Sequence, residues 1–363
     1  MTADIGRRVV ELMASSGQQL THKELAQLVD MTPDAFSRAV NGKRSFSAIE
    51  LATIADVLAG DVQWLITGLR DTQRMTIAAR HDFDPTSRSR SIAGFPSDRE
   101  VLDSIAVAYQ QAFADDEAKT SDIPVTAPGV RELLGADFVR PFIERLEAKL
   151  GIDVVRVSGL STSYCLEIGG RRVIVIAATG NWFRENWSIA HELGHIAGGH
   201  QFQDDYPSDA DEATANAFAA ELLLPTEMVS AFDWAGLTAN DLAERVWEFG
   251  VSTDALATRL RALRIDRADL VDDWAAQPTQ RLLRRHWHGQ SDVVDEITSR
   301  MDDASTRRFP LALQDAHLAK IATGDLGKAT LAWMLGIRAD DLEVDAPQQD
   351  EMDSSELALA LEL

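Results

Sequence analysis

Two histidines and a glutamate in the middle of the chain have the spacing of a metal-binding helix. His191 and His195 are four residues apart, and Glu192 directly follows the first of them. Residues four apart on an α-helix lie on one face, so both imidazoles can reach one cation. In this HExxH pattern the imidazoles hold Zn²⁺, and the adjacent carboxylate accepts a proton from water that the ion polarises. The pattern therefore predicts hydrolytic zinc chemistry.

The residues before the motif favour a buried helix. Residues 186–190 contain neither proline nor glycine, and Trp187 and Ile189 supply apolar side chains. Such a stretch is typical of a helix inside a domain. The competing interpretation is an amphipathic helix whose histidines make ordinary polar contacts without a metal.

A third ligand must come from a second helix, and a fourth position must stay open to water and substrate. Residues 208–225 begin with polar side chains, continue with alanine and leucine, and end at Pro225. This pattern predicts a helix that packs closely against the first. Glu212 is the expected third ligand, and Asn216, one turn later on the same face, is expected to orient that ligand or the substrate.

Two other assignments are open for the acidic residues of this helix. Glu212 could instead complete a capping box that Asp209 begins. Glu221 competes with Glu212 for the metal. Nine residues along a helix correspond to about 900° of rotation, so the two carboxylates point to opposite faces and only one can serve.

At these positions the chain resembles the ImmA/IrrE zinc metallopeptidases. The resemblance rests on the HExxH motif within residues 188–195 and on residues 212–225, and it covers about residues 140–265. It implies an endopeptidase that cuts a repressor or another regulatory partner in stress responses, mobile-element control or toxin–antitoxin-type regulation. His200 follows the second ligand by five residues, whereas many members have a histidine at four, so we assign it no metal role. The resemblance implies a general base at Glu192 and zinc ligands at His191, His195 and Glu212.

Short capped helices are expected at the N-terminus, over residues 3–15, 22–29, 34–40, 47–58 and 62–66. Thr21 and Glu24 have the spacing of a capping box, and Thr32 is followed by Pro33, a favoured first helical residue. The order of these helices predicts a helix-turn-helix, and residues 4–69 resemble the Cro/repressor-like (XRE-type) DNA-binding domains.

This second resemblance implies that residues 1–69 bind duplex DNA. Asp34 and Pro33 depart from the neutral polar residues usual at these positions, and the segment is slightly acidic. A helical module for protein contacts or dimerisation is therefore the alternative, and dimerisation would also suit a repressor-like module that binds paired half-sites. The resemblance places Asp34, Ser37 and Arg38 at base edges, and Asn41, Lys43 and Arg44 at phosphates.

The remaining pattern divides the chain into a linker (70–97), a peptidase domain (98–265), a helical C-terminal region (266–345) and an acidic tail (346–363). In the peptidase domain we expect helices at 97–113 and within 128–150, and strands at 152–157, 164–168 and 172–176 with a hairpin turn at Gly169 and Gly170. An edge strand near the metal would suit an extended substrate. The fold class is mainly α with a small β-sheet (α+β).

Two regions beyond the motif helices are expected to be mainly structural. A helix pair follows within residues 242–260, with Leu256, Leu260 and Leu263 in the core. Later in the chain, a basic and aromatic cluster is interpreted as a solvated helix face with one packed tryptophan, and as a binding surface only in the alternative. The cluster comprises Arg281, Arg284, Arg285, His286, Trp287 and His288.

Composition limits the other possibilities. The chain has 363 residues, a net charge of −23 and one cysteine, Cys165. A single cysteine excludes internal disulfides and suits a reducing compartment, and its apolar surroundings indicate packing rather than catalysis. Strong negative charge opposes nonspecific binding to nucleic acid or anionic membranes, so any DNA contact must be local. Without a secretion signal or a long apolar run, we expect a cytoplasmic protein with no membrane contact.

Three functions remain. The first is a zinc endopeptidase coupled to DNA binding, which cuts a regulatory partner or its own linker near Arg88, with Tyr206 as a candidate for stabilising the oxyanion. The second is a helix-turn-helix transcriptional regulator whose metal domain senses zinc or a ligand without hydrolysis. The third is a structural HExxH helix that holds no metal.

Overall fold

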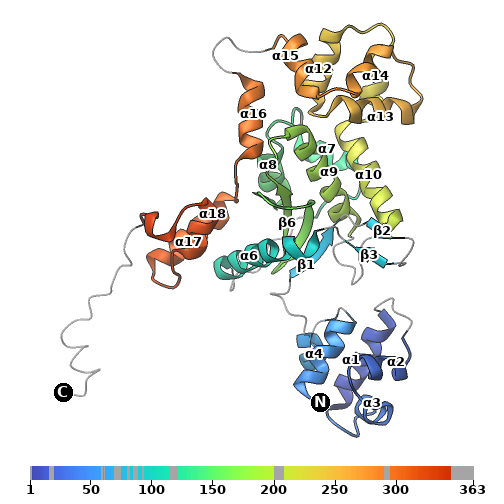
Figure 1. The fold of residues 1–363 in the computed structure, drawn as a ribbon, viewed down its shortest axis with the longest axis vertical. Helices are drawn as coiled ribbons and strands as arrows, with labels where there is room; N and C mark the ends of the chain where they lie inside the picture. Colours follow the sequence, from blue (N-terminus) through green and yellow to red (C-terminus); the bar gives the residue numbers. More distant parts are fainter. Residues whose placement is uncertain are drawn as a thin grey trace, which may run out of the picture.

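The computed structural model describes residues 2–15, 20–58, 60, 62–68, 75–79, 82–84, 89–91, 94–113, 122–199, 208–289 and 295–344. These residues form many helices and a small sheet (Figure 1). The expected α+β fold class is confirmed. Of the sequence expectations, the tail at 346–363 and the residues His200, Tyr206 and Arg88 lie outside the described residues.

The first five helices share a hydrophobic core of their own. Thr21 and Glu24 form the predicted capping box, and Thr32 caps the third helix with Pro33 at its start. Phe36 on that helix is fully buried against the neighbouring helices. The five are α1 (Thr2–Ser15), α2 (His22–Leu28), α3 (Pro33–Val40), α4 (Ala48–Val57) and α5 (Val62–Thr67).

The main sheet has the strand order β1-β5-β6-β4. β5 (Tyr164–Ile168) and β6 (Arg171–Ala177) are antiparallel, and β4 (Ile152–Val157) pairs in parallel with β6. Gly169 and Gly170 join β5 to β6 with φ of 56° and 76°, a left-handed conformation that favours glycine. All three strands and the hairpin turn lie where the sequence predicts them.

The segment expected to be a linker contributes a strand to this sheet. β1 (Met75–Ala79) pairs antiparallel with β5, and β2 (Asp82–Asp84) pairs with β3 (Ser89–Ser91). α6 (Phe95–Phe113) begins two residues before the expected helix start. Residues 70–97 are therefore not wholly a connector. Without β1, the outer edge of β5 would leave backbone N–H and C=O groups unpaired, and β1 supplies their hydrogen-bond partners.

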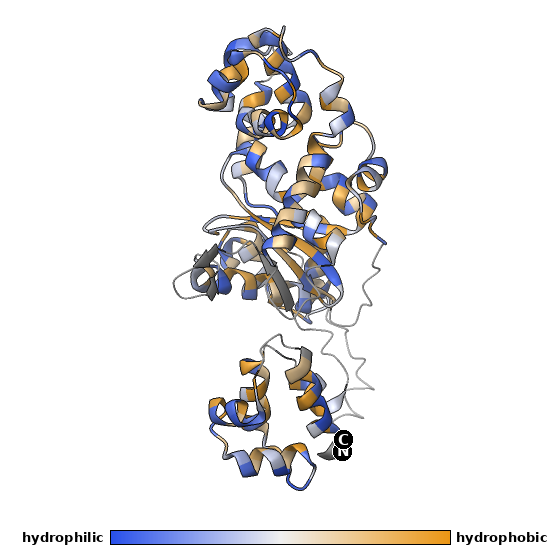
Figure 2. Cartoon of the chain, turned by 90° about the vertical axis from the view of Figure 1, so that its right-hand side faces the viewer, coloured by the Kyte–Doolittle hydropathy of each residue, from blue (hydrophilic) through white to orange (hydrophobic). Residues whose placement is uncertain are grey.

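Helices cover both faces of the sheet. Ile174 of β6 faces α9 and the helices around it, whereas Val175 faces α6, α17 and α18. In Figure 2 the strands that carry a hydropathy colour are largely orange, and the helices mix blue and orange. Within the described part, no helix has the length and apolar character needed to cross a bilayer. The other helices are α7 (Ala127–Leu134), α8 (Phe142–Arg145), η1 (Leu146–Leu150), α9 (Trp182–Gly198), α10 (Asp209–Leu223), α11 (Thr226–Ser230), α12 (Ala239–Phe249), α13 (Thr253–Leu263), α14 (Asp269–Ala275), α15 (Thr279–His286), α16 (Glu296–Ser305), α17 (Leu311–Ala322), α18 (Ala329–Leu335) and η3 (Ala339–Asp341).

The C-terminal helices share their cores with helices of the segment 98–265, the predicted peptidase domain. Leu256 and Leu260 are fully buried, as predicted, and Leu263 packs against the same core as Val271 of α14. Trp287 stacks on Trp247 of α12, with ring centroids 3.8 Å apart. The predicted boundary at residue 265 therefore does not separate two hydrophobic cores.

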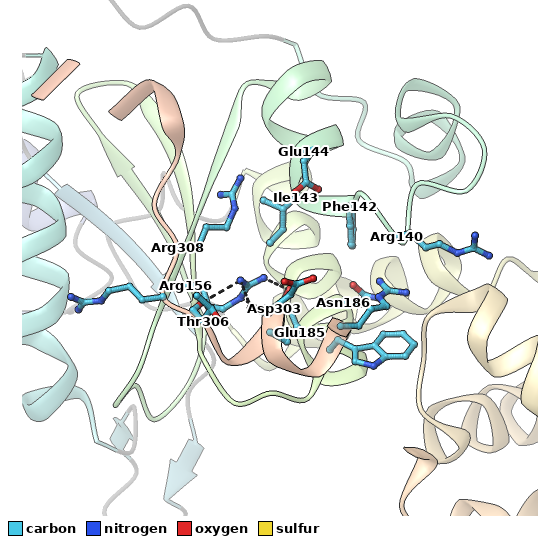
Figure 3. Close-up of a pocket in the computed structure, with 14 residues that line it drawn as sticks. Arg140, Phe142, Ile143, Glu144, Arg156, Glu185, Asn186, Asp303, Thr306 and Arg308 are labelled. Carbon is cyan, nitrogen blue, oxygen red and sulfur yellow. Dashed lines mark hydrogen bonds and ion pairs between the residues drawn. The ribbon is translucent and has the colours of Figure 1, made fainter. Parts of the chain in front are cut away.

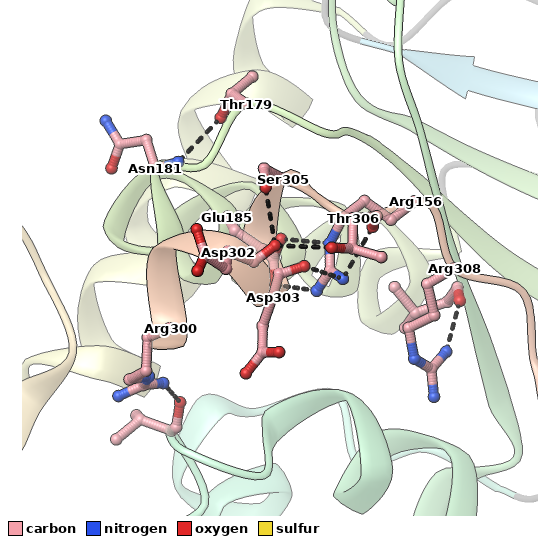
Figure 4. A network of polar contacts seen from close by, with 12 residues as sticks. Arg156, Thr179, Asn181, Glu185, Arg300, Asp302, Asp303, Ser305, Thr306 and Arg308 are labelled. Atoms are coloured by element: carbon pink, nitrogen blue, oxygen red, sulfur yellow. Dashed lines mark hydrogen bonds and ion pairs between the residues drawn. The ribbon is translucent and has the colours of Figure 1, made fainter. Parts of the chain in front are cut away.

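A buried arginine joins β4, α9, the end of α16 and the segment after it (Figure 4). Arg156 makes two hydrogen bonds to the carboxylate of Glu185, at 2.6 and 2.7 Å, and donates to the carbonyl of Asp303 at 2.7 Å. Its backbone also exchanges two hydrogen bonds with Arg308, both 2.9 Å. The side chains of Arg156 and Glu185 are only 7% and 10% exposed, so this ion pair is shielded from water.

We expect Arg156→Met to lower the unfolding free energy by about 3–5 kcal/mol, because it leaves the carboxylate of Glu185 buried without its partner. Chemical denaturation of the variant and wild type measures the loss. Arg99→Met is the matched control, because Arg99 and Asp103 form an exposed pair whose loss should cost less than about 1 kcal/mol. Equal losses in the two variants would contradict the stabilising role of Arg156.

Candidate metal centre

α9 supplies both histidines and the neighbouring glutamate. The helix starts after Asn181, whose side-chain oxygen accepts a hydrogen bond from the backbone N–H of Arg184 at 3.1 Å. It ends before Gly199, which has a left-handed φ of 70°. His191 and His195 are 5% and 0% exposed. Neither ring is therefore an ordinary polar group facing solvent.

The first turn of α10 distinguishes the two roles considered for Glu212. Ser208 caps this helix, and its hydroxyl accepts a hydrogen bond from the backbone N–H of Asp211 at 3.2 Å. The carboxylate of Asp211 accepts from the backbone N–H of Ser208 at 2.7 Å, which completes the capping box. The alternative in which Asp209 and Glu212 form the capping box is wrong, because Ser208 and Asp211 form it instead.

α9 and α10 approach closely where small residues face each other. A Cβ atom added to Gly194 would lie 2.9 Å from the Cα of Ala215 and 3.0 Å from its carbonyl oxygen. Even a methyl group on Gly194 would therefore force the two helices apart. This close crossing allows the side chain of Glu212, one turn before Ala215, to reach the histidines.

Three side chains converge between these helices. The Nε2 atoms of His191 and His195 are 3.1 Å apart, and the carboxylate oxygens of Glu212 lie 3.3 Å from the first and 3.4 Å from the second. The group is the only one among the described residues in which at least three histidine, cysteine or acidic side chains cluster closely enough to hold a metal ion.

These separations fit a bound Zn²⁺. Tetrahedral zinc bonds of about 2.0–2.2 Å place neighbouring donor atoms about 3.3–3.6 Å apart. The measured separations of 3.1–3.4 Å are close to this range, and each of the two that involve Glu212 ends on a different oxygen of its carboxylate. The Oε1 atom of Glu212 is buried 3.4 Å from Nε2 of His195, and no hydrogen bond within the described residues satisfies it, an arrangement that costs free energy unless another group binds this oxygen. Two imidazoles and one carboxylate are a donor set that zinc uses in hydrolytic sites.

Asn216 holds one of the rings. Its side-chain Oδ1 lies 3.2 Å from Nδ1 of His191. A proton on Nδ1 would make this contact a hydrogen bond and leave the lone pair of Nε2 directed at the other donors. The predicted orienting residue is thus in contact with a predicted ligand.

Glu192 is fully buried beside this cluster. One carboxylate oxygen accepts a hydrogen bond from the hydroxyl of Ser163 at 2.7 Å, and the other has no hydrogen-bond partner in the described part of the chain. Burial raises the pKa of Glu192 above the ordinary carboxyl value, although His191 and His195 oppose this shift. A raised pKa suits a group that must accept a proton and then return it.

Sequence reasoning missed Ser163 and the residue that positions its loop. Asp98 of α6 is 1% exposed. It accepts hydrogen bonds from the hydroxyls of Ser161 at 2.5 Å and Tyr164 at 2.6 Å. These bonds hold the residues on both sides of Ser163. A serine in a loop has no local signal, because only tertiary packing brings it to Glu192.

Other candidates have structural roles or positions outside the centre. The side chain of Glu221 forms an ion pair with Arg259 and accepts a hydrogen bond from the hydroxyl of Thr226 at 2.8 Å. It therefore fixes the turn after α10 rather than competing for the metal. Cys165 is fully buried, and burial raises the pKa of its thiol, which opposes a role as a nucleophile.

A separate cavity of about 350 Å³ lies at the first turns of α9 (Figure 3). None of the candidate metal ligands lines it. Arg156 is paired there with Glu185, and Arg300 lies over the ring of Trp182, 4.1 Å from its centroid. Burial, followed by the nearby charge of Arg140, lowers the pKa of Arg300 to about 10. The cavity therefore lies where α8, α9 and α16 meet.

The predicted DNA-contacting residues gather on α3 and the turn after it. Asn41 is exposed, and its side chain donates a hydrogen bond to the carbonyl of Ser37 at 2.7 Å. Arg44 pairs with Glu50 at 2.6 Å, so its guanidinium is already partly neutralised within the chain. The other predicted contacts are all exposed: Asp34, Ser37, Arg38 and Lys43.

Comparison with known families gives one match. Residues 147–261 match the IrrE N-terminal-like domain (Peptidase_M78). The matched IrrE N-terminal-like segment contains α9, α10 and strands β4–β6, and therefore the whole candidate centre. The match supports the ImmA/IrrE family and a metallopeptidase-type function. No curated protein and no solved structure matches the chain.

We expect Gly194→Ala to weaken zinc binding by about 10–100-fold, the range seen when groups that orient metal ligands are lost. The added methyl group would separate α9 from α10 and move Glu212 away from the histidines. A zinc titration against a competing chelator measures the change. Gly327→Ala is the matched control, because a Cβ there meets nothing within 4 Å. Unchanged affinity in the Gly194 variant would contradict the importance of the close crossing.

Proposed function

We propose that the chain is a zinc-dependent endopeptidase that cuts a regulatory protein and is coupled to DNA binding through residues 1–69. The observation that carries the proposal is the convergence of two imidazole nitrogens 3.1 Å apart with the carboxylate of Glu212, whose oxygens each lie 3.3–3.4 Å from one of them, beside the buried carboxylate of Glu192. His191, His195 and Glu212 would hold the ion. Bound zinc would supply Lewis acidity toward water and the scissile carbonyl.

The chemistry of the chain's own residues centres on Glu192. Its Oε2 atom can accept a proton because Ser163 hydrogen-bonds only to the other oxygen. The same carboxyl group can then give the proton to the leaving amine of the cleaved peptide bond. Its buried position excludes bulk water and holds the carboxyl group in one orientation. In the proposed mechanism, three residues thus serve as metal ligands and Glu192 serves separately as the proton-transfer group.

Substitution of each glutamate should separate binding from catalysis. We expect Glu192→Gln to keep zinc but to cut a quenched fluorescent peptide library about 10²–10⁴-fold more slowly, because the proton acceptor is lost. Glu212→Ala should lose the metal, whereas Glu221→Ala, its control on the same helix, should keep it. Elemental analysis and fluorescence measure both effects.

The outcomes separate the alternatives. A non-hydrolytic sensor would bind zinc but show no cleavage in the wild type, so Glu192→Gln would change nothing. A structural HExxH helix would copurify without metal. Retention of zinc by Glu212→Ala would overturn the proposed ligand set.

The proposed DNA contact rests on the exposed side chains of α3 and the following turn. We expect Arg38→Ala to weaken binding to duplex DNA by about 1–3 kcal/mol, and Lys43→Ala to reduce the slope of log affinity against log salt by about 1. Binding to a duplex selected from a random pool, followed by fluorescence anisotropy, measures both. Arg7→Ala removes the same charge from α1 and should have little effect. If all three variants bind like the wild type, the helical unit serves protein contacts instead.

A further inference from the structure

Strand β1 is paired at the side of the sheet that leads to the candidate centre. Met75 pairs with Ile168, and Ala79 pairs with Tyr164. Tyr164 directly follows Ser163, whose hydroxyl donates to Glu192 at 2.7 Å. β1 therefore runs antiparallel along β5 toward the end that contacts the proposed proton acceptor.

β5 is an edge strand apart from this pairing. It lies between β1 and β6 in the sheet, so without β1 its outer backbone groups have no strand partner. An extended peptide can bind such an edge by adding a strand, with affinity from main-chain hydrogen bonds. Any chain paired as β1 is would have its C-terminal end directed at Glu192. A peptidase needs the backbone of its substrate to reach the proton acceptor, and a chain paired with β5 would extend toward Glu192.

The composition of β1 suits this role. The five residues from Met75 to Ala79 carry no charge and include the β-branched Thr76 and Ile77. In a chain with a net charge of −23, an extended segment without acidic residues adds no negative charge along the edge of β5. The edge of β5 thus fits an uncharged, extended polypeptide.

We propose that Met75–Ala79 occupies the substrate-binding edge of the peptidase in cis, so that a protein substrate must displace β1 to reach Glu192. This inference rests on the proposed function. A tethered strand acts at an effective concentration of about millimolar, so it competes strongly with a separate substrate chain. The strand also links the edge of the catalytic sheet to the helical unit at residues 2–68 through a short segment. Events at that unit can therefore change access to the edge.

The test compares binding of one peptide to full-length variants. All proteins carry Glu192→Gln, so that neither the chain nor the peptide is cut. The peptide is a fluorescent copy of residues 73–82. Ile77→Pro with Ala78→Pro disrupts β1, because proline lacks the N–H that the ladder needs and adjacent positions cover both hydrogen-bonding registers. Val125→Pro, at a position that is 76% exposed outside any strand, is the matched control.

We expect the double proline variant to bind the peptide at least about tenfold more tightly than the parent and the Val125→Pro control, as measured by fluorescence anisotropy. Equal affinity in all three proteins, or no binding to the double variant, would overturn the inference. Circular dichroism and zinc content show that each protein is folded. Absence of zinc from every protein would count against the proposed peptidase function, whereas the comparison of peptide affinities would still decide whether β1 occupies the edge.

Discussion

The close contact between Gly194 and Ala215 is the constraint on which the candidate centre depends. Histidines one turn apart on α9 are positioned by helix geometry alone, but the third donor comes from another helix. A glutamate side chain is short, so α10 must approach α9 more closely than two ordinary side chains permit. Glycine and alanine at the crossing meet this requirement. The alanine-rich sequence of α10 is therefore part of the construction of the site.

The sheet positions the other half of the centre. Asp98 on α6 fixes the residues around Ser163, and Ser163 in turn holds one oxygen of Glu192. A second connection is made by Arg156, which joins β4 to the start of α9 through Glu185. Both connections use charged groups in buried surroundings, where hydrogen bonds are strong and loss of a partner is costly. α9 is thus held by the sheet at two points along its length.

Local signals in the sequence predicted most of the elements but few of the long-range pairings. The HExxH spacing, the caps at Thr21 and Thr32 and the glycine hairpin all depend on residues within a few positions of one another. The bond between Ser163 and Glu192 spans 29 residues, and that between Asp98 and Ser161 spans 63. No periodicity encodes such contacts. The strand within residues 75–79 was missed for the same reason, because its partner β5 lies far along the chain.

The environments of the two glutamates explain why similar side chains can have different roles. Burial tends to raise the pKa of Glu212, but the nearby ring nitrogens of His191 and His195 outweigh burial and hold it well below the ordinary value. Glu212 therefore remains an anion, which is the form that binds a cation. In Glu192, burial dominates and raises the pKa above the ordinary carboxyl value, which favours uptake of a proton by this group. Opposite pKa shifts in the two neighbouring carboxyl groups suit the proposed roles of Glu212 as ligand and Glu192 as base.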